Sequence, residues 1–167
     1  MTVQRTFSGS PWETKAGYCR ALRVGNQIFV SGTAPSDGEG GTFAPHDAYA
    51  QTKRCFDIIG QALEELGSGL QDVIRTRLYV TDMDRWEEFA NAHQELFGDN
   101  PPVNTMVAIP RLINPDMMVE VEVEVLLPEE EPIQRPIVAL GRPIQRPVDP
   151  AVYPPVIARE LDESCFD

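Results

Sequence analysis

The strictest hydropathy pattern in the chain is the alternation of valine and glutamate over residues 118–125. A period of two over this length predicts a β-strand with one apolar and one polar face. The apolar face carries Val119, Val121, Val123 and Val125, and the polar face carries Glu120, Glu122 and Glu124. Neighbouring carboxylates repel one another, so water, cations or another chain must relieve them. This polar face is therefore either exposed to solvent, or part of a polar site or of an interface between subunits.

Turn residues and shorter alternating runs predict the other strands. Residues 2–7 suit an edge strand. Residues 8–17 suit a loop, because Pro11 and Gly17 interrupt regular secondary structure. Residues 18–24 and 27–31 form a predicted hairpin around Gly25 and Asn26. Residues 32–45 are rich in glycine and predict a second loop. Residues 104–109 form a short predicted strand before the alternating one.

The predicted strand over residues 72–81 also alternates. Its sequence places Ile74, Leu78 and Val80 on one side, and Arg75, Arg77 and Tyr79 on the other. Cationic residues on this strand can pair with the glutamates of residues 118–125 if the two strands are neighbours.

Two amphipathic helices are predicted. The first begins after Asp47, a good N-cap, and ends before Gly67. Its apolar stripe consists of Cys55, Ile58, Ile59, Ala62 and Leu66. The second begins at Asp82 or Asp84 and ends at Gly98. Its stripe consists of Trp86, Phe89, Ala90, His93, Leu96 and Phe97.

The resulting order is β-β-β-α-β-α-β-β, which predicts an α+β domain over residues 1–127. Both helices can cover one face of a single mixed β-sheet. The other face would then carry the arginines at 75 and 77 and the three glutamates. A sheet covered on one side only, with complementary charges on its other side, favours association of identical subunits.

Residues 128–167 differ in character from the rest. They hold eight of the fifteen prolines and a repeated PIQRP motif at Pro132 and Pro143. Dense proline excludes helices and interior strands. One interpretation is a disordered, solubilising extension. Regularly spaced large apolar residues favour the other interpretation, an extended C-terminal arm that lies on a protein surface.

Composition narrows the functional classes. The formal net charge is −12, which argues against binding nucleic acid through a basic surface. The sequence predicts no membrane span and no signal peptide, so we expect a cytoplasmic protein without a membrane partner.

Histidine and cysteine are too few and too dispersed to predict a metal site. Cys19, Cys55 and Cys165 form neither a metal-binding pattern nor a disulfide framework, and Cys55 is expected in the core. His93 is expected to be a core histidine, and His46 has no partner nearby in sequence. We therefore expect no metal.

Several short segments form a more specific signature. They are the Gly17–Tyr18 pair before the hairpin, VSGTAP at residues 30–35, Gln51, DVIRTRLYVTD at residues 72–82, the strand at residues 101–107, and the VEVEVEV ending. Together with the element order, they resemble the reactive intermediate deaminase family, also called the Rid, YjgF or L-PSP endoribonuclease family. The resemblance covers roughly residues 7–127.

This resemblance implies a fold and a type of site. The family has a chorismate-mutase-like fold and forms homotrimers, with ligands in clefts between subunits. Its best-known members hydrolyse imines and enamines without a cofactor, and an arginine holds the substrate carboxylate. That arginine corresponds to Asn104 here, which has neither the charge nor the guanidinium fork. The family glutamate corresponds to Glu120, and the tyrosine to Tyr18.

The candidate site residues follow from this comparison. The candidate catalytic residues are Glu120, Asn104 and Tyr18, and the candidate substrate-binding residues are Ser31, Gly32, Thr105, Arg75 and Arg77. Two functions remain open. The first is a cofactor-free hydrolase of an atypical imine, enamine or related small metabolite. The second is a non-catalytic trimer that binds metabolites or proteins in the same cleft. Ribonuclease activity, which some family members are said to have, is disfavoured by the acidity.

Overall fold

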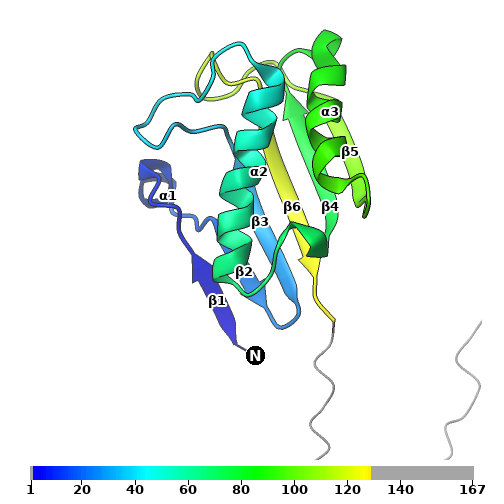
Figure 1. Ribbon diagram of the computed structural model, residues 1–167. Helices are drawn as coiled ribbons and strands as arrows, with labels where there is room; N and C mark the ends of the chain where they lie inside the picture. Colours follow the sequence, from blue (N-terminus) through cyan, green and yellow to red (C-terminus); the bar gives the residue numbers. More distant parts are fainter. Residues whose placement is uncertain (1, 129–167) are drawn as a thin grey trace, which may run out of the picture. The chain divides into compact units, whose positions relative to one another are not determined.

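The computed structural model describes residues 2–128, which fold around one six-stranded β-sheet (Figure 1). The expected C-terminal arm lies outside the described residues from residue 129 onward. The strands are β1 (Val3–Thr6), β2 (Ala21–Val24), β3 (Gln27–Thr33), β4 (Val73–Val80), β5 (Val103–Ala108) and β6 (Val119–Leu126). The helices are α1 (Pro11–Ala16), α2 (Ala48–Glu65) and α3 (Trp86–Phe97), with 3₁₀ turns η1 (Leu70–Asp72) and η2 (Met83–Arg85).

The sheet has the strand order β1-β2-β3-β6-β4-β5. Only β4 and β5 pair in parallel, and the other pairs are antiparallel. The last strand, β6, therefore lies in the middle between β3 and β4. Helices α2 and α3 lie side by side over one face, as Figure 1 shows. The predicted α+β class, with one mixed sheet and two helices on one face, is confirmed.

The core lies between the sheet and these two helices. The valines of β6 are buried, as their alternation predicted, and they pack with residues of β3, β4, α2 and α3. This cluster includes Val119, Val121, Val123, Val125, Ile28, Val30, Leu78, Val80, Phe56, Ile59, Leu63 and Phe89. Each such side chain contributes about 1.5–3 kcal/mol on burial. Cys55 is fully buried among them, as expected.

The ends of α2 follow the sequence signals. The Asp47 side chain accepts a hydrogen bond from the backbone N–H of Ala50 at 2.8 Å, so Asp47 is the N-cap. Gly67 has φ +75° and donates to the carbonyl of Glu64. A left-handed residue just after a helix favours glycine, which lacks a Cβ, and this explains why α2 stops there.

Four details of the prediction are wrong. Residues 11–16 form α1 instead of a loop. Ile74 is exposed because a register shift between Val73 and Arg75 turns it out of the core. Trp86, the first residue of α3, is 52% exposed and lies outside the buried stripe. Ile58 is half-buried, because it lies at the margin of the α2 stripe and lines a cavity.

The uncovered face of the sheet carries a ladder of opposite charges. Arg77 lies 2.8 Å from Glu124 and 3.6 Å from Glu122, and Arg75 lies 3.5 Å from Glu124. The Tyr79 hydroxyl donates to Glu122 at 3.1 Å. The charge complementarity expected between these two strands is therefore present. Among residues 2–128, no helix combines the length and hydropathy needed to span a membrane.

Candidate functional site

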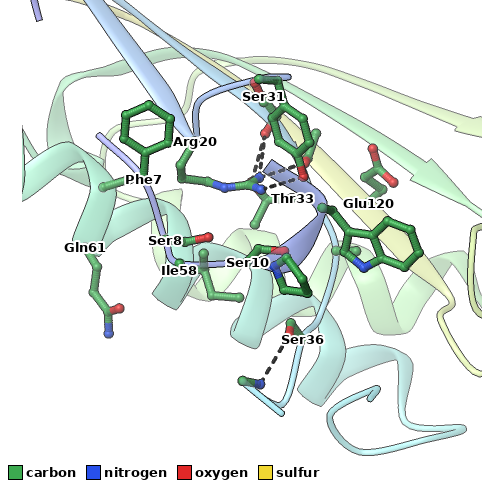
Figure 2. Close-up of a pocket in the computed structure, with 18 of the residues that line it drawn as sticks. Phe7, Ser8, Ser10, Arg20, Ser31, Thr33, Ser36, Ile58, Gln61 and Glu120 are labelled. Carbon is green, nitrogen blue, oxygen red and sulfur yellow. Dashed lines mark hydrogen bonds between the residues drawn. The ribbon is translucent and has the colours of Figure 1, made fainter. Parts of the chain in front are cut away.

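A cavity of about 610 Å³ lies beside α1, α2 and the bulged end of β3 (Figure 2). Its wall has a polar part and an apolar part. The polar groups include Tyr18, Arg20, Ser31, Thr33, Arg54 and Glu120, and the apolar groups include Phe7, Trp12, Ala34, Ile58, Ile113 and Met117. This volume and mixture suit an organic ligand with apolar and polar parts.

A buried ion pair supports one wall of the cavity. The Glu13 carboxylate accepts hydrogen bonds from Arg20 Nε at 3.2 Å and from the Ser8 hydroxyl at 2.7 Å. Both side chains of the pair are less than a tenth exposed. Burial alone would raise the pKa of Glu13, but the hydrogen bonds from Ser8 and the charge of Arg20 outweigh it and leave that pKa below its ordinary value. This ion pair ties α1 to the sheet.

The other nitrogens of Arg20 hold the bulge in β3. The pairing of β3 with β6 shifts register between Val30 and Thr33, which leaves the intervening carbonyls without regular strand partners. Arg20 Nη1 donates to the Gly32 carbonyl at 2.8 Å and to Thr33 Oγ1 at 2.9 Å, and Nη2 donates to the Tyr18 hydroxyl at 3.2 Å. Figure 2 shows these hydrogen bonds of the Arg20 guanidinium, close to Ser31 and Thr33. Arg20 therefore fixes both the bulge and Tyr18.

Glu120 is one of two carboxylates that line the cavity; the other, Glu65 on α2, is exposed. Glu120 lies at the start of β6 against the bulge, so close to Gly32 that a Cβ on that glycine would collide with Glu120 Oε1. Burial is the main cause that raises the pKa of Glu120; the neighbouring charge of Glu122 adds to it, and Arg20 opposes it. No hydrogen bond from residues 2–128 reaches its carboxylate. A half-buried carboxylate whose pKa is raised holds a proton more readily than a free one, which suits proton transfer.

The structure brings four of the eight predicted site residues to this cavity: Tyr18, Ser31, Gly32 and Glu120. The other four do not line it within one chain. Arg75 and Arg77 lie in the charge ladder on the uncovered face of the sheet. Thr105 lies beside Arg77 in the register of β4 and β5, and Asn104 lies beside Thr76.

Asn104 is engaged inside its own chain. Its Nδ2 donates to the Thr76 hydroxyl at 2.8 Å, and that hydroxyl lies 2.9 Å from His93 Nε2. Thr76 is fully buried, and the His93 ring packs against Phe56 and Phe97. Burial lowers the pKa of His93. His93 is thus a hydrogen-bonded core histidine, as predicted, and it stabilises the orientation of Asn104.

The sequence analysis missed three residues that line the cavity, Trp12, Arg20 and Arg54, and also Glu13, the buried partner of Arg20. Part of the signal was present, because Ser10-Pro11-Trp12-Glu13 followed by Gly17 matches the start and end of a short helix. In the structure, Glu13 turns inward to Ser8 and Arg20 instead of capping α1. In residues 2–128, no group of three or more metal-ligating side chains occurs.

Comparison with protein families places most of the described residues in a known family. A family model described as Endoribonuclease L-PSP matches residues 9–127. This range contains the sheet except β1, both long helices and every cavity residue discussed above except Phe7 and Ser8.

Individual proteins and solved structures agree with this match. An uncharacterized protein of Streptomyces coelicolor is 37% identical over 122 residues, which are 73% of this chain and 90% of that protein. A RutC family protein of Pyrococcus abyssi is 36% identical over 63% of this chain and 82% of its own length. The crystal structure of Rv2704 from Mycobacterium tuberculosis, a member of the YjgF/YER057c/UK114 family, superposes with a TM-score of 0.69 at 38% identity, and covers 75% of this chain and 100% of that one.

Proposed function

The chain belongs to the endoribonuclease L-PSP family, also known as YjgF or Rid, and on this premise we propose that it hydrolyses an imine or enamine without a cofactor. The observation that carries the proposal is Glu120, a half-buried carboxylate of raised pKa that lines the cavity beside Gly32 and Tyr18. We propose that the ligand bound in this cavity is a small metabolite.

The reaction needs one water and one proton shuttle. The Glu120 carboxylate accepts a proton from water while the water oxygen bonds to the carbon of the protonated imine, which gives a neutral carbinolamine. Glu120 then returns this proton to the nitrogen. As the C–N bond breaks, the carbinolamine hydroxyl loses its proton to the departing ammonia, so ketone and ammonium leave and Glu120 is again a carboxylate. The Tyr18 hydroxyl, which accepts from Arg20, can donate its own proton to the ligand and hold it in place.

A substrate panel tests this proposal and separates it from the standard activity of the family. Imines and enamines generated in situ, with and without a carboxylate next to the imine carbon, are mixed with the protein and ammonia release is measured. We expect release from at least one of them. We expect poor turnover of 2-aminoacrylate and iminopyruvate, because the missing charged contact at Asn104 costs about a hundredfold. Efficient turnover of iminopyruvate would contradict this prediction.

A second candidate function is ligand binding without turnover. The Asn104 amide, which is bonded to Thr76, favours it, because this amide is turned away from any ligand in its own chain. Saturable binding of a metabolite, with no ammonia released from any imine in the panel, would support this alternative.

We also propose that the protein is a homotrimer in which the uncovered sheet face is buried. Apolar side chains such as Phe29, Val103 and Val107 are exposed there beside the charge ladder. Since Asn104 and Thr105 do not line the cavity of their own chain, they could join a site only from a neighbouring copy.

Light scattering tests this assembly. We expect three chain masses at micromolar protein concentration. Phe29→Glu should dissociate the trimer, because Phe29 lies opposite Glu124 in the strand register and a carboxylate there adds repulsion. Trp86→Glu is the matched control, an exposed aromatic residue on α3, and should leave the mass unchanged. A monomeric wild-type protein would refute the proposal.

Gly32→Ala is expected to move the Glu120 carboxylate. The new Cβ collides with the flexible end of Glu120, so the unfolding free energy should change by only about 1 kcal/mol. A displacement of about 1 Å at a catalytic group can reduce turnover about a hundredfold. Melting curves and ammonia release measure the two effects. Gly60→Ala is the control, since its Cβ meets only Leu70 at an ordinary 3.8 Å. Undiminished turnover in Gly32→Ala would contradict the placement of Glu120.

A further inference from the structure

A second arginine lines the cavity, and its guanidinium is largely free. Arg54 Nε, on α2, donates to the Ser36 carbonyl at 2.9 Å. None of the ion pairs within residues 2–128 involves Arg54. Its two terminal nitrogens therefore keep four N–H groups without a partner among the described residues. The side chain is half-buried, and the Phe43 ring, 6.0 Å from the guanidinium carbon, limits its movement.

The other arginine in this cavity is already occupied. Arg20 uses its nitrogens for Glu13, Gly32, Thr33 and Tyr18, and the Glu13 carboxylate neutralises its charge. Of the cations that line the cavity, Arg54 is the one with an uncompensated charge within residues 2–128. A half-buried guanidinium with free, parallel N–H groups matches the two oxygens of a carboxylate.

Arg54 holds the loop at Ser36 and not the bulge beside Glu120. Figure 2 shows Ser36, whose carbonyl Arg54 holds, well separated from Ser31 and Glu120. Both charges nevertheless act on the same buried thiol. Burial is the main cause that raises the pKa of Cys55, Glu120 raises it further, and Arg54 lowers it. The apolar side chains of Ala34, Ile58 and Met117 line the same cavity.

We propose that Arg54 binds a carboxylate of the ligand, and that an apolar spacer separates this carboxylate from the carbon attacked beside Glu120. The ligand is then a metabolite with a distal acid group, not one with its carboxylate next to the imine carbon. The inference rests on the proposed site in this cavity, but it requires binding only.

Keto acids that resemble the hydrolysis product provide the probes. Levulinate and its next two longer homologues carry a ketone and a distal carboxylate, and their primary amides have the same shape without the charge. Calorimetric titration should show that at least one carboxylate binds about tenfold or more tightly than its amide, the range of a charge-assisted contact. Equal affinity of each pair, or no binding of any of the carboxylates, would overturn the inference.

Variants assign this preference to a residue. Arg54→Gln should remove it by weakening carboxylate binding about tenfold or more, while amide binding is unchanged. Lys53→Gln, the matched control, removes a charge from the next residue, whose side chain pairs with Glu95 outside the cavity, and should leave the preference intact. Arg54→Lys keeps the charge and should keep part of the preference for the carboxylate. If Arg54→Gln does not fold, this variant still tests the role of Arg54. A preference that survives Arg54→Gln would refute the role of Arg54.

The binding and the reaction can fail separately. A charge preference that depends on Arg54, with no ammonia release from any imine, would sustain the distal-anion site and refute hydrolysis. Turnover of neutral imines, with no such preference, would sustain hydrolysis and refute the site at Arg54.

Discussion

Glu120→Gln is expected to slow imine hydrolysis about a hundred- to ten-thousand-fold, the range for removal of a general acid–base group. Gln keeps the size of the side chain but can neither accept a proton from water nor return it to nitrogen. In the wild-type protein, turnover should rise as pH increases through the raised pKa of Glu120, because the carboxylate form is the base.

The same substitution should stabilise the fold. Since the folded pKa of Glu120 is raised, the folded state binds its proton more readily than the unfolded state does. Glu120 therefore destabilises the protein at a pH above its folded pKa, and this cost disappears as pH falls below the unfolded pKa. Glu120→Gln removes the cost at neutral pH, so its melting temperature should be higher than that of the wild type. A residue with a purely structural role would show the opposite change.

Glu122→Gln is the matched control for this prediction. It carries the same substitution two residues along β6, where Glu122 pairs with Arg77 and Tyr79. Turnover should persist in this variant, with its rise moved to lower pH, because Glu122 helps to raise the pKa of Glu120. Equal loss of turnover in both variants would show that the charge of the sheet face matters and not Glu120 itself.

Arg20→Leu should lower the free energy of unfolding by about 3–5 kcal/mol, the cost of leaving one member of a buried ion pair alone. The substitution leaves the buried Glu13 carboxylate without its cationic partner. It also removes the hydrogen-bond donors to Gly32, Thr33 and Tyr18. Urea denaturation measures the loss. Because the folded pKa of Glu13 is lowered, its contribution is present above the unfolded pKa and is lost as pH falls through the folded pKa.

Arg85→Leu separates this effect from the general cost of losing an arginine. Arg85 pairs with Glu88 at 2.6 Å, but both side chains are about a third exposed. Exposed pairs contribute about 0–1 kcal/mol, so this variant should remain close to the wild type. Similar losses in the two variants would show that the Arg20 pair has no special role.

The architecture was predictable because its main signals are local. The alternation of residues 119–125, the Asp47 cap and the glycine after α2 each fix an element without reference to the rest of the chain. The error at Ile74 arose because a distant segment decides: the bulge beside it depends on pairing with β6. The error at Trp86 is local, because a 3₁₀ turn, η2, occupies the residues just before it. Neither irregularity is visible in the spacing of apolar residues.

Only half of the candidate site was predictable for a similar reason. Tyr18, Ser31, Gly32 and Glu120 were found through family resemblance, which carries three-dimensional information that hydropathy lacks. The partners of Arg20 come from α1 and β3, so its burial could not be inferred from its own neighbours. Arg54 lies on a predicted helix, but a sequence does not show which arginines lack a carboxylate partner.

The central position of β6 has a consequence for how the protein folds. This strand is synthesised last among the described elements, yet it pairs with both β3 and β4. Until it joins, the nascent chain has two unpaired strand edges, which are open to wrong pairing with other chains. Closing the sheet also requires contacts between residues far apart in sequence, and such contacts slow folding. Premature termination before residue 119 should therefore give aggregates, whereas chains that include β6 should fold in one cooperative step.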